Sequence, residues 1–192
     1  MNAKKIVTAG LALVMVAGIS VAGTLAYLTA KTDEKVNTFT VGNIQIELTE
    51  PDWTAGEGGQ KILPGDVVKK DPTVTVKANS EACYVYVAID NGLKLDDGTL
   101  AGTLNIDTSS WNVVKTSDDT TVYRYKEVVN TSAEDNVLPD VFTTVTVSSD
   151  VTSENIDQLN NDKITAQAYA HQSQNVDQGV ADAAALAFFG IA

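Results

Sequence analysis

Two side chains that could act as a nucleophile, a base or a metal ligand occur once each in the sequence, His171 and Cys83. A single histidine excludes a zinc helix of the H-E-x-x-H type and a histidine-rich metal site. His171 ends a segment in which polar Thr165, Gln167 and Tyr169 alternate with small or apolar residues. We therefore expect a surface histidine there, rather than a metal ligand or a catalytic base.

A cysteine acts as a nucleophile only when a base or a positive charge stabilises its thiolate in an accessible place. Cys83 instead begins CYVYVAID, a strongly apolar segment, which predicts a buried and inert thiol. Because it is the only cysteine, it cannot form a disulfide within the chain. A Ser-His-Asp triad is not indicated either, because the sequence has no G-x-S-x-G turn. The sequence thus predicts no catalytic residue.

Acidic residues occur in adjacent pairs at three places, Asp96-Asp97, Asp118-Asp119 and Glu134-Asp135. Such pairs suggest a calcium hypothesis, because hard cations bind several oxygen ligands at once. None of them matches the D-x-[DN]-x-[DN]-G loop, however, and we interpret them as solvated turn residues. Metal ligands are therefore not predicted, and calcium is kept only as a weak alternative.

Four aromatic residues could form a platform for a carbohydrate: Trp53, Trp111, Tyr123 and Tyr125. Packing in a hydrophobic core accounts for them as well, because aromatic side chains bury large apolar surfaces, and we expect this second role. No phosphate-binding loop, dinucleotide fingerprint or paired-carboxylate signature is evident in the sequence. We therefore predict no cofactor.

The N-terminal region has the layout of a secretory signal peptide, because two lysines precede an uncharged apolar run from Ile6 to Leu28. Small residues stand at positions −3 and −1 of two candidate cleavage sites, Ser20-Val21-Ala22 and Thr24-Leu25-Ala26. The run is also long enough to span a bilayer, so a membrane anchor is the alternative. We expect cleavage at the second site, between Ala26 and Tyr27, and export of the remaining chain.

Removal of residues 1–26 would leave 11 Lys and Arg against 25 Asp and Glu, a formal net charge of −14. Nucleic acid is excluded as a partner, because its phosphates would be repelled. An anionic membrane surface is unfavourable for the same reason. The charge suits a soluble domain that is secreted to the extracellular matrix or the cell surface. Its length of about 165 residues is enough to bury one core without disulfides.

Patterns typical of β-strands occupy most of the chain after residue 37. Residues 44–48 alternate between apolar and polar types, and CYVYVAID is apolar on both faces, which predicts a central strand. Pro64-Gly65-Asp66 and Asp97-Gly98 predict turns, since proline fixes φ and glycine accepts a positive φ. Further strands rich in Thr, Tyr and Val are expected at residues 73–78, 111–115, 121–129, 141–149 and 164–172.

Two helical segments interrupt these strands. Ser153 could cap a short helix through Ile156 and Leu159, because its hydroxyl can accept a hydrogen bond from a free backbone N–H. Residues 176–189 are rich in alanine and predict a second helix, with Gly190 just past its end. Together these patterns predict an all-β fold over residues 37–192, an antiparallel jelly-roll-like β-sandwich with one or two short helices.

The junction after the apolar run carries a combination of motifs. Gly23-Thr24-Leu25-Ala26 is followed by the aromatic Tyr27, by a charged spacer and by a strand of the pattern F-x-x-G-x-[IL]-x-[IL]. That pattern is filled by Phe39, Gly42, Ile44 and Ile46. A second segment, ILPGDVVKKDPTVTVKANSEACYVYVAI, leads from an L-x-P-G-D-like turn into a long apolar strand. The combination resembles the TasA and camelysin proteins of Gram-positive bacteria over residues 1 to about 90. The remainder is similar only in its β-rich character.

The resemblance implies cleavage after Ala26 by a dedicated type I signal peptidase. It also implies a jelly-roll subunit of an extracellular biofilm-matrix fibre, in which the N-terminal segment of one subunit completes the sheet of its neighbour. Residues 27–36 would be this connector, and its uncharged members include Tyr27, Leu28, Thr29, Ala30 and Val36. Its four charges make it a poor strand for a solitary core, whereas a sheet edge or the groove of a neighbour would tolerate it. The partners implied are further copies of the chain and the peptidase, with no membrane after cleavage.

The same resemblance implies a rival function, because camelysin has been classed as a metalloendopeptidase. With one histidine and no zinc motif, we cannot assign catalytic residues for that activity. A third alternative is a cell-surface adhesin or a carbohydrate-binding module. Casein cleavage blocked by a chelator would indicate the protease, and binding of a glycan or host matrix by a monomer would indicate the adhesin. Assembly into fibres that grow as the protein concentration rises would indicate the fibre subunit.

Overall fold

A computed structural model describes the protein at residues 29–32, 36–37, 43–51, 63–130, 133–159 and 162–191. The predicted signal peptide, the cleavage site Ala26-Tyr27, Leu28 and Trp53 lie outside the described residues. In the part of the chain that is described, no helix combines the length and the hydropathy needed to cross a membrane.

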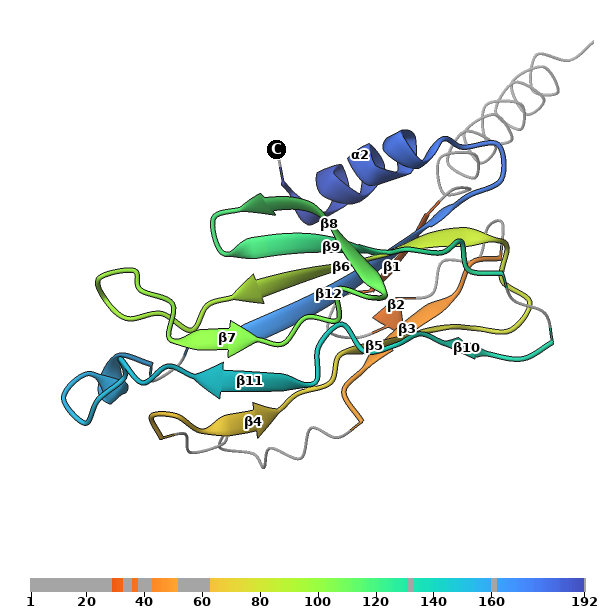
Figure 1. The fold of residues 1–192 in the computed structure, drawn as a ribbon. Coiled ribbons are helices and arrows are strands. Elements are labelled where there is room, and N and C mark those ends of the chain that lie inside the picture. The colour runs from red at the N-terminus through yellow and green to blue at the C-terminus, as the bar shows by residue number, and fades with distance from the viewer. Residues whose placement is uncertain are drawn as a thin grey trace, which may run out of the picture.

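The largest element is an antiparallel sheet of six strands, which we call sheet A, in the order β2-β1-β12-β6-β9-β8 (Figure 1). Its strands are β1 (Thr29–Thr32), β2 (Val36–Asn37), β6 (Cys83–Asn91), β8 (Trp111–Ser117), β9 (Thr120–Tyr125) and β12 (Ile164–Gln172). The position of β6 between β12 and β9 confirms the prediction of a central strand.

A second layer consists of two short antiparallel sheets, sheet B in the order β10-β5-β3 and sheet C in the order β4-β11-β7. Their strands are β3 (Ile46–Thr49), β4 (Val67–Lys69), β5 (Thr73–Val76), β7 (Gly102–Leu104), β10 (Asn136–Val137) and β11 (Thr144–Val147). The chain passes from β4 to β5 through Pro72, which has no N–H to donate to a sheet. The two sheets stay connected there, because the N–H of Val141 donates to the carbonyl of Pro72 at 3.1 Å.

The main hydrophobic core lies between sheet A and the second layer. Val85, Val87 and Ile89 of β6 enter it together, since alternate residues of a strand share one face. Opposite them, Val74 and Val76 of β5 are fully buried. The predicted turn at residues 64–66 is confirmed, and Gly65 adopts the positive φ of 80° that the turn requires.

The aromatic residues Trp111, Tyr123 and Tyr125 belong to this core or pack against it. Trp111 is 2% exposed, and its indole N–H donates to the carbonyl of Pro139 at 3.1 Å. Its ring meets that of Tyr125 edge-on, with centroids 5.4 Å apart. The expectation of core packing is therefore confirmed for these three residues, which are not available as an open sugar platform.

The opposite face of sheet A is covered by the helix α2 (Gln178–Phe189), as Figure 1 shows. Ala181 and Ala185 are the fully buried residues of the helix, and they lie over Tyr86 and Tyr169 of the sheet. Gly190 ends the helix with φ of 72°, which confirms the predicted C-cap. The alanine-rich segment thus packs over a sheet face rather than over a sheet edge.

The other predicted helix is a single 3₁₀ turn, η2 (Ile156–Leu159). The residue that caps the N-terminal end of this turn is Thr152 rather than Ser153. The Thr152 hydroxyl accepts from the N–H of Glu154 at 3.2 Å, and its carbonyl accepts from the N–H of Ile156 at 3.0 Å. The prediction that Ser153 caps this turn is therefore wrong by one residue. The predicted fold class, an all-β sandwich with little helix, is confirmed, whereas the jelly-roll topology stays a prediction.

Candidate functional site

Cys83 begins β6 and points into the main core, where none of its surface is exposed. Burial raises the pKa of its thiol to about 12, because the thiolate would lose its hydration. The sequence-based expectation of a buried thiol is confirmed, and the environment is the opposite of the one that activates a nucleophile.

We expect Cys83 to resist alkylation by iodoacetamide between pH 7 and pH 9 as long as the protein is folded. With a pKa near 12, its thiolate fraction at pH 9 is on the order of 10⁻³, and the side chain is also shielded from the reagent. Mass spectrometry after a timed reaction should find one alkyl group per chain in urea and almost none in buffer. Rapid labelling of the folded protein would show that this part of the core opens readily.

His171 lies near the end of β12 and is 5% exposed, so the prediction of a surface histidine is wrong. The polar alternation of the segment indicated a solvated face, but this face of β12 lies under aromatic side chains. The ring of the adjacent Tyr169 stacks on Phe188 of α2 at 4.9 Å, and His171 lies 6.2 Å from Tyr169 between ring centroids. The Nδ1 atom of His171 is 2.9 Å from the carbonyl oxygen of Gln172, a contact of the local backbone.

The acidic pairs lie in turns or beside strands, as the solvated-turn interpretation predicts. Asp97 accepts from the N–H of Thr99 at 2.9 Å, and this bond holds the pKa of the Asp97 carboxyl below its usual value. Asp119 pairs with Lys94. Among the residues that the structure describes, no group of three or more His, Cys, Asp and Glu side chains could hold a metal ion.

Part of the predicted connector lies at one edge of sheet A. Thr29 and Ala30 belong to β1, in which residues 29, 30 and 31 are opposite residues 171, 170 and 169 of β12. Val36 belongs to β2, which pairs with the outer side of β1. The connector residues therefore extend the sheet of their own chain through main-chain pairing.

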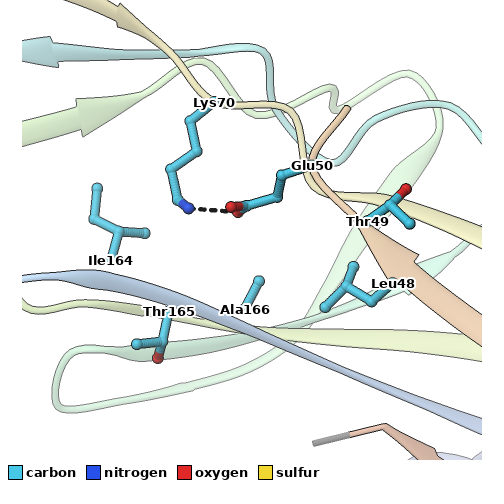
Figure 2. A pocket seen from close by; sticks show the side chains of 7 residues that line it. All are labelled: Leu48, Thr49, Glu50, Lys70, Ile164, Thr165 and Ala166. Carbon is cyan, nitrogen blue, oxygen red and sulfur yellow. Dashed lines mark hydrogen bonds and ion pairs between the residues drawn. The ribbon is translucent and has the colours of Figure 1, made fainter. Parts of the chain in front are cut away.

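The register pairs between β1 and β12 involve residues 169–171 of β12. A groove of about 340 Å³ lies between the first residues of β12 and the second layer (Figure 2). It is lined by Leu48, Thr49, Glu50, Lys70, Ile164, Thr165 and Ala166. An edge with an adjoining groove is the arrangement to which an extended peptide can add as a further strand.

An ion pair between Glu50 and Lys70 forms one wall of the groove. The Lys70 side chain is 11% exposed and that of Glu50 25%, so the pair is partly withdrawn from water. In Figure 2, Ile164 and Ala166 point toward the pair, whereas Thr165 points away from it. The groove is therefore lined by apolar side chains of β12 on one side and by a charged pair of the second layer on the other.

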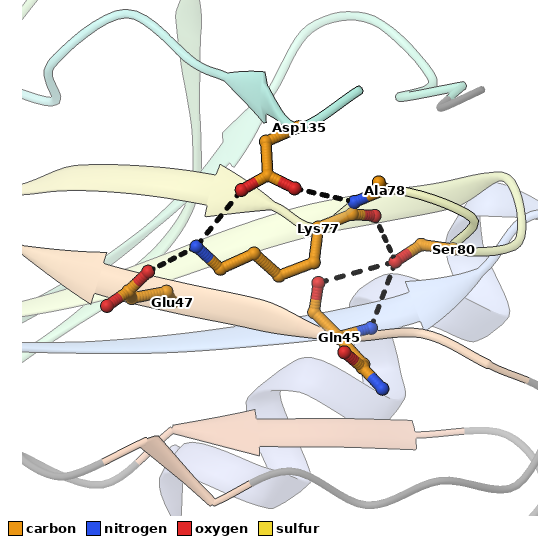
Figure 3. A network of polar contacts seen from close by, with 6 residues as sticks. All are labelled: Gln45, Glu47, Lys77, Ala78, Ser80 and Asp135. Atoms are coloured by element: carbon orange, nitrogen blue, oxygen red, sulfur yellow. Dashed lines mark hydrogen bonds and ion pairs between the residues drawn. The ribbon is translucent and has the colours of Figure 1, made fainter. Parts of the chain in front are cut away.

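A second lysine shows how the protein places a cation between carboxylates. Lys77 pairs with Glu47 and with Asp135, the latter at 3.2 Å (Figure 3). The hydrogen bond to Glu47 and, to a smaller extent, that to Asp135 raise the pKa of Lys77, because both favour its charged form. One lysine in this second layer thus binds two acids at the same time.

The strand at the other edge of sheet A, β8, has features that hinder pairing with another chain. The register of β8 against β9 shifts between Val113 and Lys115, so a bulge interrupts the strand. Bulges and lysines are devices by which natural sheet edges avoid adding further strands. The two edges of sheet A are therefore unequal, and the groove lies beside β12.

A polar cluster attaches α2 to sheet A. The guanidinium of Arg124 on β9 donates to both carboxylate oxygens of Asp182, at 2.8 and 2.7 Å. The Tyr86 hydroxyl donates to the same carboxylate at 2.8 Å. Burial and, to a smaller extent, this bond raise the pKa of Tyr86, so its hydroxyl keeps the proton that it donates. The side chains of Arg124 and Asp182 are only 12% and 22% exposed.

No protein-family model, curated protein or solved structure matches this chain.

Proposed function

We propose that the protein is a secreted structural subunit of an extracellular biofilm-matrix fibre. Copies would join by donation of the N-terminal segment, residues 27–36, of one copy to the β12 edge of the next. The observation that carries this proposal is the main-chain pairing of Thr29, Ala30 and Lys31, which belong to the expected connector, with β12 near one edge of sheet A. The resemblance to TasA and camelysin proteins points to the same mode of assembly.

Exchange of the segment between copies requires no new pairing. A strand from a second copy could form with β12 the same register pairs that β1 forms within its own chain. Identical contacts make exchange of an element between copies a low-cost route to assembly. The concentration of the protein then decides between pairing within one chain and pairing between two copies.

The location of the segment in the sequence explains why assembly would wait for export. The connector follows directly on the expected cleavage site between Ala26 and Tyr27. Cleavage by a type I signal peptidase would release its N-terminus, so that the segment could leave its own sheet and reach a neighbour.

The proposal is tested by N-terminal sequencing of the secreted protein together with negative-stain microscopy of the same sample over a range of concentrations. We expect a start at Tyr27 and regular filaments above a critical concentration. Monomers at every concentration would contradict the proposal, and glycan binding by those monomers would indicate an adhesin. Casein cleavage that a chelator blocks would indicate the protease. Retention of residues 1–26 would indicate a membrane-anchored domain.

A further inference from the structure

The peptide bond between Asp71 and Pro72 lies where the chain passes from β4 to β5, and groups that can react with it surround it. We propose that the protein cleaves its own chain at this bond, with the carboxylate of Asp71 as the nucleophile and the hydroxyl of Thr73 as the group that stabilises the oxyanion. The reaction is a peptide hydrolysis within one chain. It is independent of the proposed fibre function, because it needs no second copy.

The two residues at the bond supply a nucleophile and a leaving group. The side-chain carboxylate of Asp71 reaches the carbonyl carbon of its own residue by closing a five-membered ring, and attack within one molecule has a high effective concentration. The bond to Pro72 is a tertiary amide, so the nitrogen leaves as a basic secondary amine. A carboxylate has about four lone-pair sites, so other contacts of Asp71 do not prevent one of its oxygens from reacting.

The carbonyl oxygen of Asp71 is the atom on which negative charge develops during this attack. The Thr73 hydroxyl lies 2.9 Å from that oxygen and donates to it. Thr73 belongs to β5, is paired with Thr49 of β3 and is 6% exposed, so the donor is held in place with little competition from water. A fixed donor at a developing oxyanion is among the largest contributions to catalysis of acyl transfer.

Asp140 is brought to the same hydroxyl by the segment that follows β10. The N–H of Val141 donates to the carbonyl of Pro72 at 3.1 Å, which aligns this segment with the start of β5. The Oδ1 atom of Asp140 then lies 2.6 Å from the Thr73 hydroxyl oxygen. Asp140 is partly exposed, so water can approach the site from this side.

The protonation state of Asp140 determines how strongly Thr73 acts on the bond. A hydroxyl has one proton, so an ionised Asp140 competes with the Asp71 carbonyl for it. A protonated Asp140 instead donates to the Thr73 oxygen and leaves the hydroxyl proton to the carbonyl. Asp140 acts only through Thr73, and it is therefore a positioning residue.

The rate of self-cleavage should depend on pH for this reason. The charged groups on the adjoining elements are Asp71 itself, Lys69 of β4 and the ion pair of Glu50 with Lys70. Asp140 must gain a proton while Asp71 stays ionised, so the rate should rise and then fall as the pH is lowered. We expect cleavage to be about tenfold or more faster at pH 5.5 than at pH 7.5.

The reaction needs water and no other reagent. An oxygen of the Asp71 carboxylate forms a bond to the carbonyl carbon, and the bond from that carbon to the Pro72 nitrogen breaks. The nitrogen takes up a proton from the solvent, and the acyl part is left as a cyclic anhydride. Water then opens the anhydride, which restores the Asp71 side chain and produces a new C-terminal carboxylate.

The two fragments would stay together after the cut. Strand β3, before the bond, pairs with β5, after it, from Ile46–Thr49 to Thr73–Val76. Strand β4 pairs with β11 in the same way. The cleaved protein should therefore elute as one particle in buffer and separate only in denaturant.

Incubation of the purified secreted protein at 37 °C with protease inhibitors tests the proposal. Samples taken over one week at pH 5.5 and at pH 7.5 are denatured and analysed by mass spectrometry. We expect one fragment that ends at Asp71 and one that begins at Pro72. The same protein unfolded in urea should stay intact at both pH values, because the hydroxyl no longer lies against the carbonyl.

Substitutions assign the roles within the site. Thr73→Val should slow cleavage about a hundredfold, and Thr73→Ser should restore most of the rate. The matched control is Thr75→Val, which alters the same face of the same strand two residues away and should leave the rate unchanged. Asp140→Asn should remove the acceleration at pH 5.5, and Asp140→Glu should restore part of it. Asp71→Ala should abolish cleavage. Circular dichroism before incubation checks that each variant is folded.

The outcomes decide the proposal without reference to fibres. Intact folded protein after one week at both pH values would overturn it, and so would equal cleavage in urea. Cleavage of Thr73→Val at the unsubstituted rate would show that the fold does not assist the reaction. Cleavage of Asp71→Ala would indicate a contaminating protease and would overturn the proposal as well. All these results would leave the fibre function standing, because microscopy measures it separately.

Discussion

Deletion of residues 27–36 should abolish fibre growth and leave a folded monomer. The main core contains residues of β3, β5, β6, β9, β11 and β12. β12 also keeps its pairing with β6 from Ile164 to Gln172. The deleted segment supplies main-chain pairs at the sheet edge, so its loss removes the donor without opening the sandwich. Circular dichroism should find cooperative melting, and microscopy should find no filaments.

A matched control replaces residues 27–36 by a Gly/Ser segment of the same length. This variant keeps the chain length but has no side chains suited to a strand, because glycine and serine form flexible linkers. It should behave like the deletion, with a folded monomer and no filaments. Regular filaments from either variant would show that copies join through another surface.

Replacement of Asp182 by Ala should lower the free energy of unfolding by about 3 kcal/mol, because it leaves the mostly buried guanidinium of Arg124 without its carboxylate. The Tyr86 hydroxyl loses its acceptor in the same step. Urea unfolding followed by tryptophan fluorescence measures the change, and Trp111 in the main core reports it.

Asp177→Ala is the control for this substitution. Asp177 is exposed at the start of the same helix and forms no side-chain capping bond, so its removal should change the free energy of unfolding by no more than about 0.5 kcal/mol. The double variant Arg124→Met with Asp182→Leu should lose less than Asp182→Ala, since it removes both charges together. Equal stability of the Asp182 and Asp177 variants would contradict the role assigned to the ion pair.

The elements that the sequence predicts well are those whose residue types are determined by the local conformation of the chain, such as a strand pattern or a turn. The alternation of Val85, Val87 and Ile89 with Tyr84 and Tyr86 indicates a strand that is buried on both faces, and β6 is such a strand. The turn at Gly65 and the helix end at Gly190 follow from the positive φ that glycine accepts. These features are local, so a single sequence is enough to find them.

Features that depend on distant segments were missed. The sequence predicts a solvated His171 because Thr165 and Gln167 lie on the same face of the strand. In the folded protein, however, Phe188 and Phe189 pack on Tyr169 beside it. The ion pair of Glu50 and Lys70 joins residues 20 positions apart on either side of a Gly-rich segment. No spacing rule connects two such charges, because only the packing of the second layer against β12 brings them to one groove.

The connector, residues 27–36, includes one feature that the sequence predicts and one that it does not. Its charges predict a strand that belongs at an edge, and Thr29 and Ala30 lie in β1, next to the edge strand β2. The register against β12 could not be predicted, because the segment has no alternation strong enough to choose a face.

The inequality of the two edges of sheet A would give the proposed fibre a direction. In the proposed fibre, a donated N-terminal segment would meet the β12 side of its neighbour, so the two surfaces that meet would be unlike, and the bulged β8 at the other edge offers no equivalent contact. Contacts between unlike surfaces repeat without a two-fold axis and generate open filaments. One tip of such a filament would present an empty groove, and the other an N-terminal segment that no neighbour has accepted. A short peptide of residues 27–36 would therefore cap one tip only, and the fibre would have a chemical polarity like that of an actin filament.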